Sequence, residues 1–169
     1  MSVYSEPLDH QLLLERLAKA KRVLILGCPY CASLSISYYR GIPFYKISRH
    51  PTWTNGVAEE AHEIKELLEK DGKSVEIYGL SVIGSPYCRP DPLKEKIIKK
   101  KAQIADTVLV LSCVGGLVGV SQTLRDMHDK KIVHGMKTLG CGTFRLKWKP
   151  PFSFVIDKKS AKVSKVQGE

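Results

Sequence analysis

The sequence lacks any long apolar run. Its 169 residues hold no stretch near the roughly 20 apolar residues that cross a membrane. The polar start, MSVYSEPLDHQ, also lacks the apolar segment of a secretory signal. We therefore expect a soluble, cytoplasmic protein with no membrane partner.

Several common functional motifs are missing as well. There is no G-x-G-x-x-G or Walker pattern for a nucleotide, and no aromatic–basic motif for nucleic acid. We find neither a pair of carboxylates nor a Ser–His–Asp arrangement that suggests catalysis. These absences argue against nucleotide-dependent enzymes and hydrolases, and we do not expect nucleic acid as a partner.

Acidic residues are scarce relative to basic ones. The chain has 27 Lys and Arg against 17 Asp and Glu, a net charge of +10. Residues 94–101 and 158–165 carry much of this surplus, as a solvated helix face and a loose tail. Such a charge suits a negatively charged partner, for which the candidates are nucleic acid, an acidic protein surface or a phosphorylated ligand.

Short apolar runs alternate with helical patterns along the chain. We predict buried strands at 23–26, 75–80, 107–112 and 132–139, and an edge strand at 152–156. We predict helices at 5–21, 57–70, from 92 and at 117–128, and a short helix with an irregular loop between 32 and 51. This order predicts an α/β fold with a doubly wound, mostly parallel sheet of four to five strands, flavodoxin- or Rossmann-like. We expect the strand order 2-1-3-4, one domain over 1–156, and a disordered basic tail over 157–169.

Two helix starts carry local signals. Ser5 can cap the first helix, and Asp91-Pro92 is an N-cap followed by proline at the first helical position. In the helix after Pro92 we expect the lysines to face water and four apolar residues to face inward: Leu93, Ile97, Ile98 and Ile104.

The five cysteines follow the predicted strands. Cys28 and Cys31 come after the first, Cys88 after the second, Cys113 after the third and Cys141 after the fourth. The carboxyl ends of parallel strands lie along one edge, where such folds bind ligands. The sequence therefore predicts that all five thiols gather there.

The chemistry of such a cluster favours a metal centre. Cytoplasmic thiols stay reduced, and helix N-termini favour thiolates. Four thiolates suit either zinc or a 4Fe-4S cluster. Gly27, Gly115 and Gly116 would let backbone N–H groups approach the sulfurs. Pro-Tyr-Cys also occurs twice, at 29–31 and 86–88, which suggests similar loops serving one centre.

The stretch from Val23 to Gly142 resembles a known family. It has an apolar strand followed by GCPYCA (27–32), the segment AEEAHEIKELLEKDGKSVEI (58–77), Cys88-Arg89 before a basic helix, and IADTVLVLSCVGGLVGVSQTL (104–124). Together these resemble the N-terminal α/β part of the MetV-type partner subunit of methylenetetrahydrofolate reductase.

The resemblance implies a role. Cys28, Cys31, Cys88 and Cys113 match family cysteines expected to ligate a cluster or metal, whereas Cys141 has no clear counterpart. It implies an electron-transfer or accessory subunit of a redox complex in one-carbon metabolism, docked to a partner subunit that binds the folate. The family's cysteine-rich C-terminal segment is missing, so no second centre is expected.

Other functions stay open. Cys28-Pro29-Tyr30-Cys31 is also the active-site tetrapeptide of glutaredoxins, which predicts thiol–disulfide exchange with Cys28 as nucleophile. A zinc–thiolate site could assist methyl transfer. Gly115-Gly116 before a helix could hold a phosphate. Buried free cysteines can also be inert.

Overall fold

A four-stranded parallel sheet forms the centre of the protein. The computed structural model describes residues 1–47, 53–81 and 85–166. The sheet has the order β5-β2-β6-β7, formed by Ser74–Tyr78, Arg22–Gly27, Thr107–Leu111 and Lys131–His134. Neighbouring strands are parallel throughout. The predicted order 2-1-3-4 is therefore confirmed.

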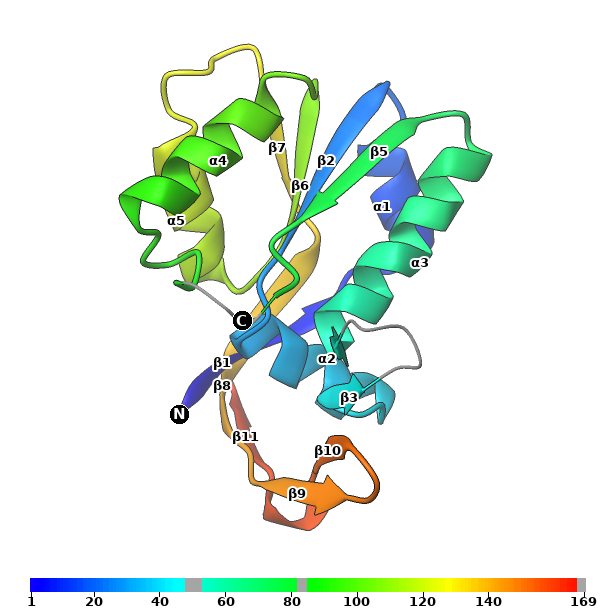
Figure 1. The fold of residues 1–169 in the computed structure, drawn as a ribbon, viewed down its shortest axis with the longest axis vertical. Coiled ribbons are helices and arrows are strands. Elements are labelled where there is room, and N and C mark those ends of the chain that lie inside the picture. The colour runs from blue at the N-terminus through cyan, green and yellow to red at the C-terminus, as the bar shows by residue number, and fades with distance from the viewer. Residues whose placement is uncertain (48–52, 82–84, 167–169) are drawn as a thin grey trace.

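Helices cover both faces of this sheet. Helices α1 (His10–Arg16) and α3 (Gly56–Lys70) lie on one side, and α4 (Pro92–Ala102) and α5 (Val114–Thr123) lie on the other (Figure 1). Strand β6 is buried along its whole length because it is sandwiched in this way. Asn55 caps α3 by accepting the N–H of Ala58.

Two antiparallel sheets extend the molecule beyond a purely doubly wound arrangement. One has the order β1-β8-β11, formed by Ser2–Pro7, Met136–Thr143 and Lys162–Lys165. The other has the order β4-β3-β10-β9, formed by Trp53–Asn55, Tyr45–Ile47, Ser153–Ile156 and Leu146–Lys149. Helix α2 (Cys31–Arg40) packs against β1, and a short 3-10 helix, η1, covers Lys158–Ser160.

The N-terminal prediction was wrong. Residues 5–7, expected in a helix from Ser5, belong to strand β1, which pairs with β8. The helix starts later because Asp9, not Ser5, accepts the N–H groups of Gln11 and Leu12. Ser5 instead hydrogen-bonds Thr138 on β8 at 3.0 Å.

The fourth predicted strand is two strands in two sheets. Strand β7 ends at His134, and β8 begins at Met136 in the antiparallel sheet. Gly135 stands between them, where a Cβ would lie 2.6 Å from Leu111 Cδ2. The chain can turn beside β6 only because this residue has no side chain. The fifth predicted strand, which forms β10, likewise belongs to an antiparallel sheet.

The tail expected to be disordered has structure. Lys158–Ser160 form η1, and Lys162–Lys165 form β11. Val163 pairs with Gly142 in the ladder between β11 and β8. Strand β8 lies between β1 and β11, and its edge facing β11 supplies a hydrogen-bonding partner that the basic composition of the tail did not reveal.

Helix α4 starts where expected and buries Ile98 as predicted, but it also turns Lys94 inward. Asp91 caps it by accepting the N–H of Lys94 at 2.8 Å. Leu93 and Ile104, expected inside, are 68% and 62% exposed, whereas Lys94 is buried. The Lys94 ammonium donates to the carbonyl of Ser85 and lies over the Tyr87 ring. These two contacts compensate for burying a cation.

Candidate metal centre

Four of the five cysteines stand at the carboxyl end of the parallel sheet. Cys28 follows β2 directly, and Cys31 is the first residue of α2. Cys113 is the N-cap of α5, two residues after β6 ends. Cys88 precedes α4. Because β2 and β6 are neighbours, their following loops emerge side by side.

The four side chains approach one another. The Cys113 thiol donates a hydrogen bond to the Cys31 sulfur. Cys31 and Cys88 lie close enough to Cys28 for their charges to act on its thiol. Gly115 lies close to both Cys88 and Cys113. A Cβ added to this glycine would lie 3.4 Å from Cys88 Cβ and 3.9 Å from Cys113 Sγ. The four cysteines thus form one group, which we call the cysteine cluster.

The two Pro-Tyr-Cys segments meet at Cys28. The backbone N–H groups of Tyr30 and Tyr87 both donate to the Cys28 sulfur. Each copy of the tripeptide therefore contributes one tyrosine N–H to the Cys28 sulfur. Tyr87 is fully buried, and its hydroxyl donates to the carbonyl of Tyr78 at 3.3 Å, which fixes this loop against the core.

Further N–H groups surround the other sulfurs. The N–H of Val3 on β1 and the hydroxyl of Ser2 donate to Cys31. The N–H of Gly116 donates to Cys113. Strand β1, which the sequence had suggested to be a helix, thus forms one wall of the site. Donors aimed at sulfur stabilise thiolates and tune the potential of a metal bound to them.

These contacts change the acidity of the thiols. The hydrogen bond from Cys113 lowers the pKa of Cys31 to about 6, and it raises the pKa of Cys113. Burial raises the pKa of Cys28 despite its two amide donors. Of the hydrogen-bonded pair, Cys31 is therefore the thiol that ionises first, and it is half-buried.

Three glycines of α5 bring the Cys88 loop onto the helix. A Cβ on Gly119 would lie 1.9 Å from the Tyr87 carbonyl oxygen, and one on Gly116 would lie 2.7 Å from Ser112 Cβ. Gly115 and Gly116 thus lie at the cluster, as the sequence suggested, but the tightest approach is at Gly119, which was not singled out. Gly27 likewise sits where a Cβ would lie 2.5 Å from Leu80 Cδ2.

Lys94 is a further residue beside the cluster that the sequence analysis missed. Its ammonium lies 4.8 Å from the centre of the Tyr87 ring. Burial lowers the pKa of Lys94, and the charge of Cys28 acts in the opposite direction, so the two groups interact. The sequence gives no sign that Lys94 is buried, because the lysines at 99–101 of the same helix are partly or fully exposed.

Cys141 lies on β8, in a different sheet from the parallel strands whose ends carry the other four cysteines. It is exposed on β8, opposite Val3 on β1 and Ser164 on β11. No contact between its sulfur and another cysteine is recorded in the described part of the chain. The prediction that it follows a parallel strand was wrong, because β8 belongs to another sheet.

The sulfurs are spaced too widely for one small ion. Across residues 1–47, 53–81 and 85–166, no three cysteine sulfurs lie within 4.8 Å of one another. A tetrahedral zinc site would hold its sulfurs about 3.8 Å apart, given Zn–S bonds of about 2.3 Å. A cluster spaces its thiolates more widely, because several iron atoms and sulfides stand between them.

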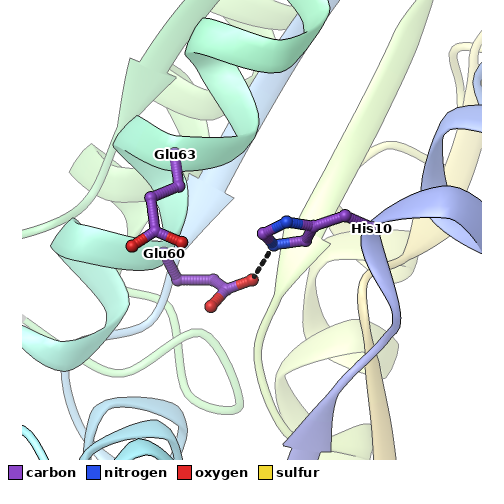
Figure 2. A group of neighbouring side chains, drawn as sticks. All are labelled: His10, Glu60 and Glu63. Carbon is purple, nitrogen blue, oxygen red and sulfur yellow. Dashed lines mark hydrogen bonds and ion pairs between the residues drawn. The ribbon is translucent and has the colours of Figure 1, made fainter.

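One group of potential metal ligands, on α1 and α3, does have its ligand atoms within this mutual distance. His10, Glu60 and Glu63 bring one ligand atom each within 4.8 Å of the others (Figure 2). Glu60 is 1% exposed, and His10 Nε2 lies 3.0 Å from its Oε1. The sequence analysis found no carboxylate pair and missed this one, which lies one helical turn apart on α3.

Arg40 already neutralises these carboxylates. Its guanidinium lies 2.6 Å from Glu60 Oε2 and 2.6 Å from Glu63 Oε2. The group therefore joins the ends of α1 and α2 to α3, and a cation would have to displace an arginine to bind there. We interpret it as a structural ion-pair network.

Comparisons with known proteins identify no relative. No protein-family model, no curated protein and no solved structure matches the chain. In the described part of the chain, no helix combines the length and apolar character that crossing a bilayer requires. A functional assignment therefore has to come from the cysteine cluster and its surroundings.

Proposed function

We propose that Cys28, Cys31, Cys88 and Cys113 hold an iron–sulfur cluster, and that the protein serves as an electron-transfer or accessory subunit of a redox complex. The observation that carries this is the convergence of four cysteines from three loops, with at least four N–H groups aimed at their sulfurs. Four thiolates are the usual ligand set of a 4Fe-4S cluster. Within the described residues, no three of these sulfurs meet the close mutual spacing of a tetrahedral zinc site.

The surrounding residues suit one-electron chemistry, which such a cluster supplies when bound. Tyr30 and Tyr87 orient the Cys28 sulfur through their amides, and the buried Lys94 ammonium offsets negative charge. Cys28 and Cys113 are buried, whereas Cys88 is exposed. Electrons would therefore enter or leave on the Cys88 side, where the cluster comes nearest to solvent.

The cellular role follows from the sequence resemblance and stays a proposal. A MetV-type subunit of a methylenetetrahydrofolate reductase-like complex would relay electrons to or organise a separate folate-binding chain. The parallel sheet with helices on both faces is in keeping with the flavodoxin- or Rossmann-like architecture proposed for this part of the chain.

A second candidate is thiol–disulfide exchange between Cys31 and Cys113. These two thiols share a hydrogen bond, and Cys31 has the lowered pKa. This differs from a glutaredoxin-like reaction at Cys28 and Cys31, because Cys28 is buried and its pKa is raised. A buried thiol of raised pKa is a poor nucleophile.

Anaerobic purification followed by electron paramagnetic resonance of the dithionite-reduced protein tests the proposal. We expect a brown protein with a cluster signal that is lost when Cys28, Cys31, Cys88 or Cys113 is replaced singly by Ser. Cys141→Ser is the matched control and should keep the signal.

Two results would redirect the assignment. A colourless protein with one bound zinc would favour the zinc–thiolate alternative. A metal-free protein that forms a Cys31–Cys113 disulfide on mild oxidation would favour thiol redox chemistry.

A further inference from the structure

Strand β9 is an exposed edge strand with two chemically different faces. All four of its residues, Leu146–Lys149, are exposed, and β9 is the last strand of its sheet. Trp148 pairs with Phe154 and Leu146 pairs with Ile156, so these apolar residues share one face. Trp148 is 66% exposed. Lys147 and Lys149 point to the opposite face because side chains alternate along a strand.

The outer edge of β9 offers unpaired backbone groups. The N–H of Asp157 donates to the carbonyl of Arg145 at 2.9 Å, just beyond the β9–β10 ladder. Hydrogen-bonded and non-hydrogen-bonded pairs alternate in antiparallel ladders. Leu146 and Trp148 are then the non-hydrogen-bonded positions, and their N–H and C=O groups face outward. No hydrogen bond to these groups is recorded in the described part of the chain.

Positive charge is concentrated in the segment of sequence that contains this strand. Residues 145–166 contain seven lysines or arginines and one aspartate, which is six of the ten net charges in 22 residues. Lys147 lies 2.9 Å from that aspartate, Asp157, whereas Lys149 has no ion pair with any of the residues that the structure describes. In Figure 1 the β9–β10 hairpin projects from the end of the molecule opposite the central sheet's helices α4 and α5.

These features argue against two kinds of binding partner for β9: a second copy of the chain and single-stranded nucleic acid. In a second copy of the chain, a register that pairs Leu146 with Trp148 would place lysine opposite lysine, which destabilises a ladder. Single-stranded nucleic acid needs stacking rings and phosphate-binding cations along one track. Here Trp148 and Phe154 lie on one face and the lysines of β9 on the other.

We propose that β9 binds an extended segment of a partner protein by strand addition, and that this segment alternates apolar and acidic residues. Its backbone would pair with the outward N–H and C=O groups of Leu146 and Trp148. Its apolar side chains would cover Trp148, and its acidic side chains would face Lys147 and Lys149. The lysines would also prevent β9 from pairing with itself.

Calorimetry with a short synthetic peptide of alternating valine and glutamate tests this proposal. Leu146→Pro removes an outward N–H without touching the β9–β10 ladder and should weaken binding about tenfold or more, whereas Leu146→Val keeps that N–H and should bind normally. Lys149→Glu should weaken binding about threefold or more and shift the preference toward a valine–lysine peptide. Lys19→Glu, an equal charge change at an exposed residue three positions beyond the end of α1, is the control.

Several results would overturn the proposal. They are absence of peptide binding, unchanged binding by the Leu146→Pro protein, tighter binding of a single-stranded oligonucleotide than of the peptide, and a dimer that Leu146→Pro dissociates. The proposal does not rest on the metal centre, so Cys113→Ser protein should bind the peptide as the unmodified protein does.

Discussion

Two edges of the molecule differ in where their backbone groups point. One is the carboxyl edge of the parallel sheet, where the strands end, and the other is the outer edge of β9, which has no neighbouring strand. At the first edge, loops from distant parts of the chain converge and their backbone N–H groups point inward at sulfur. At the second, a single exposed strand points its backbone groups outward. The first arrangement suits the proposed metal centre, and the second suits the proposed partner segment. The two proposed sites would therefore lie in different parts of the fold.

The sharpest contrast between the two edges concerns their large aromatic residues. Tyr87→Ala at the cysteine cluster should lower the free energy of unfolding by about 3–5 kcal/mol, because Tyr87 is fully buried. Trp148→Ala on β9 should change it by only about 0.5 kcal/mol, because most of that side chain faces solvent. Urea denaturation of both variants measures the difference. Equal losses would show that β9 is packed rather than open.

Two glutamates contact the same arginine but differ in burial, so they should contribute differently to stability. Glu60→Gln should cost about 3 kcal/mol, because it leaves Arg40 and His10 without their buried carboxylate. Glu63 contacts the same arginine but is exposed, so Glu63→Gln should cost about 0.5 kcal/mol. Chemical denaturation of the two variants, which remove the same charge, distinguishes them. If both cost the same, the network of Figure 2 would be a surface feature.

A third prediction concerns the close approach of the Cys88 loop to α5. Gly119→Ala should cost about 1–3 kcal/mol, because the new methyl group would collide with the Tyr87 carbonyl. It should also lower the metal content by displacing Cys88. Val118→Ala, at the adjacent exposed position, should change stability by about 0.5 kcal/mol at most. Thermal unfolding and iron analysis of both variants test this. Full metal content in the Gly119→Ala protein would contradict the assigned packing.

The smallest effect is expected at the opposite, amino end of the sheet. Asp106 accepts the N–H groups of Lys21 and Arg22 at 3.0 and 2.9 Å. Burial raises the pKa of Asp106, but these donors lower it by more, so it lies below 3.8 in the folded protein. Its contribution to stability is therefore complete above 3.8 and is lost as the pH falls through the folded-state pKa.

Asp106→Asn should accordingly cost about 1 kcal/mol near neutral pH and little in acid. Urea denaturation at about pH 7 and about pH 3 measures the change. Iron content should stay unchanged, because this end of the sheet holds no part of the cysteine cluster. A loss of iron in this variant would mean that the two ends of the sheet are coupled.

The centre of the parallel sheet was predictable because its two inner strands, β2 and β6, are short and mostly apolar runs. The runs at 23–26 and 107–112 have no polar face, and this is the pattern of strands buried on both sides. The same pattern placed Cys28 and Cys113 after neighbouring strands. The repeated Pro-Tyr-Cys tripeptide was visible too, although its purpose, two amides on one sulfur, needed the structure.

The antiparallel parts were not predictable in the same way. Gly135 interrupts an apolar run without ending it, so β7 and β8 look like one strand in the sequence. Strand β1 and β8 pair across more than 130 residues, a contact that local patterns do not encode. Burial of Lys94 and the meeting of His10 with Glu60 likewise depend on tertiary contacts between helices and loops.

Iron and acid-labile sulfide, measured per chain on anaerobically purified protein, test the central claim most directly. The account predicts about four of each in the unmodified protein and in Cys141→Ser, and none in Cys31→Ser. An unmodified protein with no iron after cluster reconstitution would contradict it, as would a Cys31→Ser protein that keeps its full content.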